Sequence, residues 1–216
     1  MQILPRTWDP DKVRKDYKGV VFVYDFWSWL TESKAAKKVI ELACIEDGMD
    51  ILEVACGTGI VFRKIVELNP SGKNTGIDHS PAMLNKARKK VENISGNYSL
   101  NEGNALDLGF DSGSFDLLIN NFMVDLMPLE NFEDLASEFY KVLKPGGVLV
   151  ISTFSSGKKW INGIWTWTAK HFPGLLTGCR PVSFRPYLEN SGFTIEEDLE
   201  LSQNTFPSNV LKARKT

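Results

Sequence analysis

The sequence predicts one α/β domain built on a doubly wound, mostly parallel sheet. Short apolar segments alternate with amphipathic ones between residues 50 and 154, and turn-forming residues separate them. A glycine-bearing turn at 55–59 joins the first apolar run to a helix, as in nucleoside-binding sheets. A length of 216 residues suits a single domain.

The spacing of apolar residues gives each element in order. A helix is expected over 33–45, with Ser33 as its N-cap and Asp47-Gly48 after its end. Ser80-Pro81 opens another helix, as N-cap and first helical residue. Lys144 to Gly147 (KPGG) is expected to turn the chain into a buried strand. The strands expected in this region are 50–54, 74–77, 98–101, 115–120 and 148–154, and the further helices are 60–68, 81–91 and 131–143.

The alternation stops near residue 155. A Trp-rich segment precedes an expected helix at 184–190, and strands at 193–196 and 210–213 are expected to pair as a hairpin. The single domain, 1–216, therefore divides into four parts. These are an N-terminal helical cap (1–46), a cofactor-binding core (47–154), an aromatic-rich insertion or lid (155–192) and C-terminal strands (193–216).

Composition favours a protein that acts on small molecules. The net charge of −2 comes from interspersed residues, whereas a nucleic-acid binder normally has a basic stripe. Cys44, Cys56 and Cys179 lack the spacing of a disulfide framework or a metal site, and with only two histidines we expect no metal. The thiols favour a reducing cytoplasm, and no signal peptide or membrane span is expected.

The turn at 55–59 favours a nucleoside without a pyrophosphate. A dinucleotide fingerprint needs a third glycine where Phe62 stands, and no Gly-Lys-Ser/Thr follows for a phosphate loop. Asp78 ends a second apolar run, 19 residues after Gly59, where a carboxylate can bind ribose hydroxyls. An alternative is that Asp78 caps the next helix, although Ser80 suits that task.

Five ordered motifs resemble class I S-adenosylmethionine-dependent methyltransferases. The resemblance is closest to the branch of ubiquinone/menaquinone C-methyltransferases and small phospholipid N-methyltransferases. It implies a Rossmann-like sheet of seven strands with an antiparallel C-terminal hairpin. It also implies S-adenosylmethionine as cofactor and S-adenosylhomocysteine as product. The motifs are EVACGTG (53–59), GIDHSPAML (76–84), GNALDLGF (103–110), FDLLINNF (115–122) and LKPGGVLVIS (143–152).

The resemblance also assigns cofactor contacts. Ala55 replaces the usual first glycine of the turn, and Asn104 replaces an acid that reads adenine. Cys56 is interpreted as a small buried residue rather than a nucleophile, and His79 is alternatively a surface turn residue. The implied contacts are the turn Ala55, Cys56, Gly57, Thr58 and Gly59, Asp78 at the ribose, Asn104 and Ala105 at the adenine edge, His79 and Met83 beside the ring, Glu53 near the amino group, and Asn120 or Asn121 at the methionine part.

Residues that face the acceptor are expected in the aromatic segments and after the fourth core strand. Asp125 and Tyr24 are the candidates for a catalytic base, and Asp125 is equally interpreted as a solvated loop charge. Tyr24 lies in a segment resembling the family's N-terminal YD motif, which places it at the cofactor. Tryptophans in the insertion are interpreted as core, as a lid, or as a face that contacts membrane. The predicted acceptor contacts are Tyr17, Trp27, Asp125, Trp160 and Trp165.

The sequence thus predicts a methyltransferase that acts by in-line transfer on a small apolar or aromatic acceptor. The alternatives are a protein that binds an adenosyl ligand without transferring methyl, and a nucleotide-dependent oxidoreductase. The expected partner is a small-molecule acceptor and no nucleic acid. Peripheral membrane contact is left open, as is the choice between a monomer and a homodimer.

Overall fold

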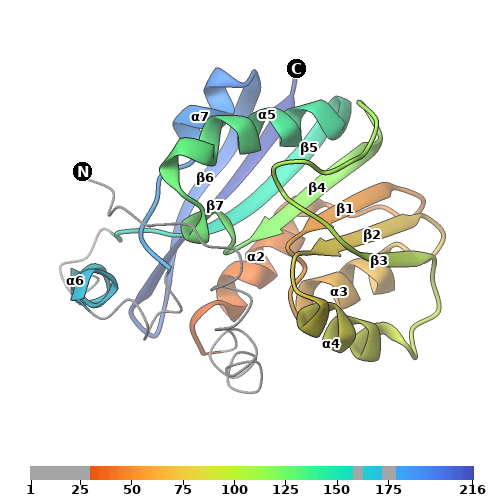
Figure 1. The fold of residues 1–216 in the computed structure, drawn as a ribbon, viewed down its shortest axis with the longest axis horizontal. Helices are drawn as coiled ribbons and strands as arrows, with labels where there is room; N and C mark the ends of the chain where they lie inside the picture. The colour runs from red at the N-terminus through yellow and green to blue at the C-terminus, as the bar shows by residue number, and fades with distance from the viewer. Residues whose placement is uncertain (1–29, 158–162, 172–178) are drawn as a thin grey trace.

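The computed structural model describes residues 30–157, 163–171 and 179–216 (Figure 1). Its helices are α2 (Ser33–Ala43), α3 (Ile60–Leu68), α4 (Pro81–Val91), α5 (Phe132–Val142), α6 (Gly163–His171) and α7 (Arg185–Asn190), with short 3-10 helices η1 (Val124–Leu126) and η2 (Leu129–Asn131). Its strands are β1 (Asp50–Val54), β2 (Lys73–Asp78), β3 (Tyr98–Glu102), β4 (Phe115–Asn121), β5 (Leu143–Phe154), β6 (Phe193–Gln203) and β7 (Phe206–Lys215).

One seven-stranded sheet organises the chain, in the order β3-β2-β1-β4-β5-β7-β6. The strands from β1 to β5 are mutually parallel, and β7 runs antiparallel to both β5 and β6. This confirms the predicted doubly wound sheet with its C-terminal hairpin. Strand order reverses between β1 and β4, so the carboxyl ends of these strands flank the crevice where such sheets bind ligands.

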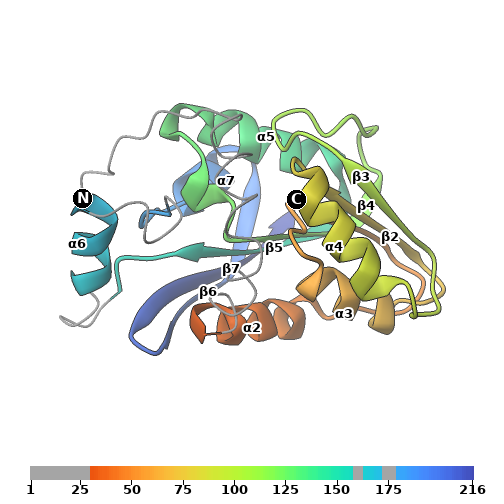
Figure 2. The same ribbon diagram turned by 60° about the horizontal axis from the view of Figure 1, so that its bottom comes forward.

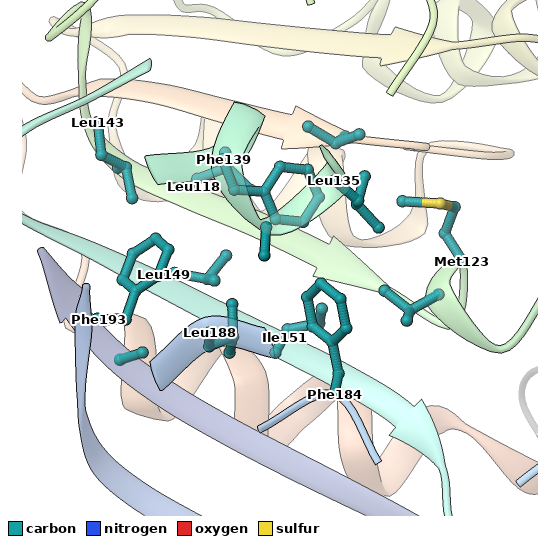
Figure 3. Packing of buried hydrophobic residues seen from close by; sticks show 14 of the residues in the cluster. Leu118, Met123, Leu135, Phe139, Leu143, Leu149, Ile151, Phe184, Leu188 and Phe193 are labelled. Carbon is teal, nitrogen blue, oxygen red and sulfur yellow. The ribbon is translucent and has the colours of Figure 1, made fainter. Parts of the chain in front are cut away.

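Helices cover both faces of the sheet (Figures 1 and 2). Helices α5 and α7 lie on one face, whereas α2, α3 and α4 lie on the other. Side chains alternate along β4, so Leu118 packs on the α5 face while Leu117 and Ile119 pack on the α2 face. Figure 3 shows the first of these cores, in which Phe139 and Phe184 fill the space between the helices and the sheet.

Helix α2 is delimited differently from the expectation. It ends at Ala43, because Cys44 adopts the left-handed conformation (φ 47°) that commonly stops a helix. Ser33 does not cap it. The Lys34 N–H donates instead to Oε1 of Gln203, the last residue of β6, at 2.6 Å. The end of β6 therefore caps this helix from a distant part of the sequence.

Three further expectations needed correction. KPGG is not a turn before β5 but part of it, since β5 begins at Leu143. Leu143 pairs with Phe115 and Val148 with Leu117, so the extra residues form an irregularity within the strand. Helix α6 was not predicted, because its apolar residues have no helical periodicity. Strands β6 and β7 extend well beyond the expected hairpin strands, with 11 and 10 residues.

Candidate functional site

The turn after β1 brings bare backbone to the carboxyl edge of the sheet. Ala55 (φ 58°), Gly57 (φ 55°) and Gly59 (φ 80°) all adopt left-handed conformations. The Cys56 N–H donates to the Ile77 carbonyl at 2.9 Å, which ties the turn to β2. The methyl group of Ala55 therefore stands at a position where glycine is strongly favoured.

The two glycines of the turn have different functions. A Cβ atom added to Gly57 would meet nothing within 4 Å, whereas one added to Gly59 would lie 2.8 Å from the Cα and Cβ of Ala87. Gly59 is therefore required by the close packing of α3 against α4. Gly57 borders open space, so it is the residue whose bare backbone can approach a ligand.

Phe62, which stands at the third-glycine position, is completely buried. The space for its ring comes from Gly76 on β2, where an added Cβ would lie 3.0 Å from the ring. The sheet therefore accommodates a large residue here by having a glycine on the strand instead of on the helix.

Asp78, at the end of β2, binds the turn through both carboxylate oxygens. Oδ2 accepts the Gly57 N–H and Oδ1 accepts the Ser80 N–H, each at 2.8 Å. Ser80 in turn caps α4 by accepting the Met83 N–H. Each carboxylate oxygen has a second lone pair, so Asp78 still has acceptor capacity for hydroxyl groups of a ligand.

Three polar side chains at the ends of β1 and β4, the buried Glu53 and Asn120 and the half-buried Asn121, each have a buried atom without a hydrogen-bond partner among the described residues. These atoms are Oε2 of Glu53, Oδ1 of Asn120 and Nδ2 of Asn121. Their other atoms are held in place: Asn120 Nδ2 donates to the Val54 carbonyl at 2.8 Å, and Asn121 Oδ1 accepts the Ser152 hydroxyl at 2.9 Å. Buried polar groups without partners are rare, so this cluster is suited to a ligand with both donor and acceptor atoms.

The electrostatics of the cluster favour a cation. Burial raises the pKa of Glu53 well above its usual range, the neighbouring Asn121 amide lowers it by a smaller amount, and the nearby Asp78 carboxylate raises it slightly. Burial also raises the pKa of Asp78. The two buried carboxyl groups disfavour a bound phosphate, whereas a bound ammonium or sulfonium group would lower both pKa values and stabilise the ionised carboxylates. The same burial raises the pKa of the Cys56 thiol, which fits its predicted packing function.

The residues expected around adenine follow the ends of β2 and β3 and differ in burial. Asn104 and His79 are exposed, Ala105 is half-buried, and Met83 is buried. Oδ1 of Asn104 accepts the Leu106 N–H at 3.1 Å, so its amide nitrogen is the atom directed to other partners. The Thr58 side chain is bonded within the fold, because its hydroxyl accepts a hydrogen bond from Nζ of Lys90 in α4 at 3.1 Å.

Asp125 is a buried residue of η1 and not a solvated loop charge. It is fully buried, and neither carboxylate oxygen hydrogen-bonds to a described residue. Burial raises its pKa to about 6, against smaller lowering effects of its own backbone N–H, the nearby Cys179 thiol, the Arg180 guanidinium and the Phe154 backbone. Arg180 and Ser152 were missed in the sequence, because no local pattern around either one indicates its distant partner.

The acceptor candidates are only partly described. Trp165, on α6, donates its ring N–H to Thr205 at 3.0 Å and packs edge-on against Phe206. It is therefore held by the turn between β6 and β7. The remaining candidates, Tyr17, Tyr24, Trp27 and Trp160, lie outside the described residues.

Comparison with known proteins identifies the family of this site. A family profile described as a methyltransferase domain matches residues 51–147, which include the turn, Asp78, Asn104 and both asparagines of β4. The chain carries a class I S-adenosylmethionine-dependent methyltransferase domain.

Relatives of this methyltransferase domain include demethylmenaquinone methyltransferases. That of Listeria welshimeri is 33% identical over 147 residues, covering 64% of this chain and 61% of the relative. That of Chlorobaculum tepidum is 37% identical over 159 residues, covering 68% and 62%. The matched region thus spans about three fifths of the length of these relatives.

A solved structure shows the same fold over nearly the whole chain. The magnesium protoporphyrin IX methyltransferase of Synechocystis, solved with bound SAH, is 18% identical. It superposes with a TM-score of 0.76 over 96% of this chain and 100% of its own. Within the described part of the chain, no cluster of metal-ligating side chains is present, and no helix is long and apolar enough to cross a membrane.

Proposed function

We propose that this protein binds S-adenosylmethionine and transfers its methyl group in line to a small apolar acceptor. The observation that carries the proposal is the set of unpartnered buried atoms on Glu53, Asn120 and Asn121, which lie at the carboxyl ends of β1 and β4, where β1 leads into the turn that holds Gly57. An amino-acid group offers an ammonium for the Glu53 carboxylate and a carboxylate for the Asn121 amide. The cluster fits the methionine part of the cofactor for this reason.

The other residues would hold the nucleoside. Asp78 would accept the ribose hydroxyls through its remaining lone pairs, and the Gly57 backbone would lie against the ligand. Asn104, Ala105, His79 and Met83 would surround the adenine. When bound, the cofactor supplies a methyl group made electrophilic by its sulfonium sulfur. The chain supplies alignment and a buried, low-dielectric environment for that group.

For the acceptor, we propose the reduced form of a quinone such as demethylmenaquinone. Curated relatives at 33–37% identity are named for that compound. A quinone ring is electron-poor, so the nucleophile must be the hydroquinone, which carries hydroxyl protons. Asp125 would accept one such proton, because it is buried, has free oxygens and has a pKa of about 6. The resulting phenolate would make the ring carbon nucleophilic.

A test of this function combines binding and turnover. Reduced demethylmenaquinone and S-adenosylmethionine should yield a methylated quinol and one S-adenosylhomocysteine per turnover, followed by mass spectrometry. Asp125→Asn should lower kcat by roughly 100-fold or more while the affinity for S-adenosylmethionine stays the same. Cofactor binding without any methyl transfer to quinols, lipids or small amines would favour the alternative of a binding protein. Binding of NADH in place of S-adenosylmethionine would favour an oxidoreductase.

A further inference from the structure

Arg180 is a buried cation that joins two segments near the site. Its side chain is 3% exposed. Nη2 donates to the Met127 carbonyl at 2.6 Å, Nη1 donates to the Asp125 carbonyl at 3.4 Å, and its backbone N–H donates to that same carbonyl at 3.3 Å. The guanidinium therefore binds the middle and the C-cap of the η1 turn that carries Asp125.

The segment around Arg180 is itself anchored to the sheet. Two residues further on, the Val182 N–H donates to the carbonyl of Phe154, the last residue of β5, at 3.0 Å. The chain at 180–182 thus connects the end of β5 to η1. Because a buried, multiply bonded guanidinium loses little freedom when it holds its partners, this arrangement fixes the position of η1 relative to the sheet.

The Asp125 carboxylate does not form an ion pair with this cation. Both carboxylate oxygens of Asp125 lack hydrogen-bond partners within the described chain, and the guanidinium bonds of Arg180 to the η1 region go to backbone carbonyls. Arg180 binds the backbone of Asp125 and acts on the carboxylate only through space. The titratable and charged groups that act on Asp125 are the Cys179 thiol and Arg180, while β5 contributes only backbone at Phe154.

The geometry points to Arg180 as a positioning residue that holds the Asp125 carboxylate at the reaction centre and keeps it available as a base. This inference rests on the proposed function, in which Asp125 accepts a proton. A guanidinium bonded directly to the carboxylate would hold it ionised and weaken it as a base. A guanidinium bonded to backbone carbonyls positions the carboxylate and leaves both oxygens free for the acceptor.

Two variants separate the charge of Arg180 from its hydrogen bonds. Arg180→Gln keeps amide donors for the carbonyl oxygens but loses the charge. Arg180→Lys keeps the charge but loses the planar fork. The titration of the Asp125 carboxyl is followed by 13C NMR of aspartate-labelled protein, with Asp125→Asn identifying the signal. The titration midpoint should rise by roughly one pH unit in Arg180→Gln and stay near the wild-type value in Arg180→Lys.

Activity toward reduced demethylmenaquinone provides the second readout. In Arg180→Gln the acid limb of the pH–rate profile should shift to higher pH, by the same amount as the NMR titration midpoint. In Arg180→Lys kcat should fall by roughly 10- to 100-fold with an unchanged limb and an unchanged affinity for S-adenosylmethionine. In the Asp125→Asn background, neither Arg180 change should cause a further loss of the same size.

The outcomes distinguish the inference from the function on which it rests. An unchanged NMR midpoint in Arg180→Gln, or full kcat in Arg180→Lys, overturns the function assigned to Arg180 even if the enzyme transfers methyl. An Asp125→Asn variant with full activity overturns the catalytic function of Asp125 instead. If Arg180→Gln does not fold, the Arg180→Lys result alone decides, because full kcat in that variant contradicts positioning.

Discussion

The Gly57 N–H donates to the Asp78 carboxylate at 2.8 Å, and this bond joins the turn after β1 to the end of β2. The second oxygen of Asp78 accepts the Ser80 N–H at the start of α4. One buried carboxylate therefore fixes the two backbone segments that border the nucleoside side of the site. A change at Asp78 should consequently affect both the fold and ligand binding.

Asp78→Asn tests this coupling. The amide can replace only one oxygen acceptor, so either Gly57 or Ser80 faces an N–H group in place of an acceptor. We expect the free energy of unfolding to fall by about 1.5–3 kcal/mol, and the affinity for S-adenosylmethionine to fall by a similar amount. Urea denaturation and isothermal titration measure the two effects. Asp111→Asn, at an exposed position, is the matched control and should change neither; equal behaviour of the two variants would contradict the assignment.

The glycines of the turn should separate binding from stability. Gly57→Ala places a methyl group in open space on the ligand side, so affinity should fall more than tenfold while stability falls by about 0.5–1 kcal/mol, the left-handed strain less the entropy that glycine has in the unfolded chain. Gly59→Ala adds a clash with Ala87 to the same backbone cost, so its stability loss should be clearly larger. Titration and thermal unfolding of both variants check this order. The reverse order would show that the ligand lies on the other side of the turn.

Ala55→Gly should stabilise the protein. Alanine at φ 58° carries the left-handed strain of an L-residue, about 1–2 kcal/mol, whereas glycine adds only about 0.5–1 kcal/mol of unfolded-state entropy. The free energy of unfolding should therefore rise by about 0.5–1 kcal/mol in denaturant titrations. Ala36→Gly is the matched control, because it lies within α2 and should lose about 1 kcal/mol. A loss of stability in both variants would contradict the strain at Ala55.

Glu53→Gln should raise the stability of the protein at high pH and weaken its binding of S-adenosylmethionine. The pKa of Glu53 is raised in the folded chain above its ordinary value of 4.5. When the pH rises above 4.5, the unfolded chain therefore releases the Glu53 proton while the folded chain retains it. The free energy of unfolding therefore falls as pH rises from about 4.5 through the folded pKa. Without this carboxyl, the variant should be more stable than wild type at pH 8, and the difference should vanish below the unfolded pKa.

The same substitution should weaken the ligand. An amide cannot pair with an ammonium group as a carboxylate does, so affinity for S-adenosylmethionine should fall by about 1.5–3 kcal/mol. Glu92→Gln, at an exposed position after α4, is the control for both measurements. Binding by Glu53→Gln at wild-type strength would remove Glu53 from the proposed site.

Local sequence patterns were sufficient to predict most of the sheet. Apolar runs bounded by turn residues indicated β1 to β5, and the position of Asp78 at the end of β2 followed from the run before it. The parallel sheet followed from the alternation of strands and helices, and its seven strands with a C-terminal hairpin were implied by the family resemblance. Polar residues at strand ends, such as Glu53 and Asn121, were therefore placed at the correct edge before any contact was known.

Contacts between distant segments were beyond prediction. Gln203 caps α2 and Arg180 holds η1, and in each case the partner is more than 50 residues away. Phe62 seemed too large for its position because the matching glycine, Gly76, lies on a different element. The burial of Asp125 likewise depends on the tertiary fold, since a single Asp between apolar residues resembles an ordinary loop charge.

Isothermal titration with S-adenosylmethionine and with NADH tests the central claim most directly. The account predicts that one S-adenosylmethionine binds per chain, that Gly57→Ala and Glu53→Gln weaken this binding, and that NADH does not bind. Tight binding of NADH without binding of S-adenosylmethionine would contradict it, as would affinity for S-adenosylmethionine that neither substitution changes.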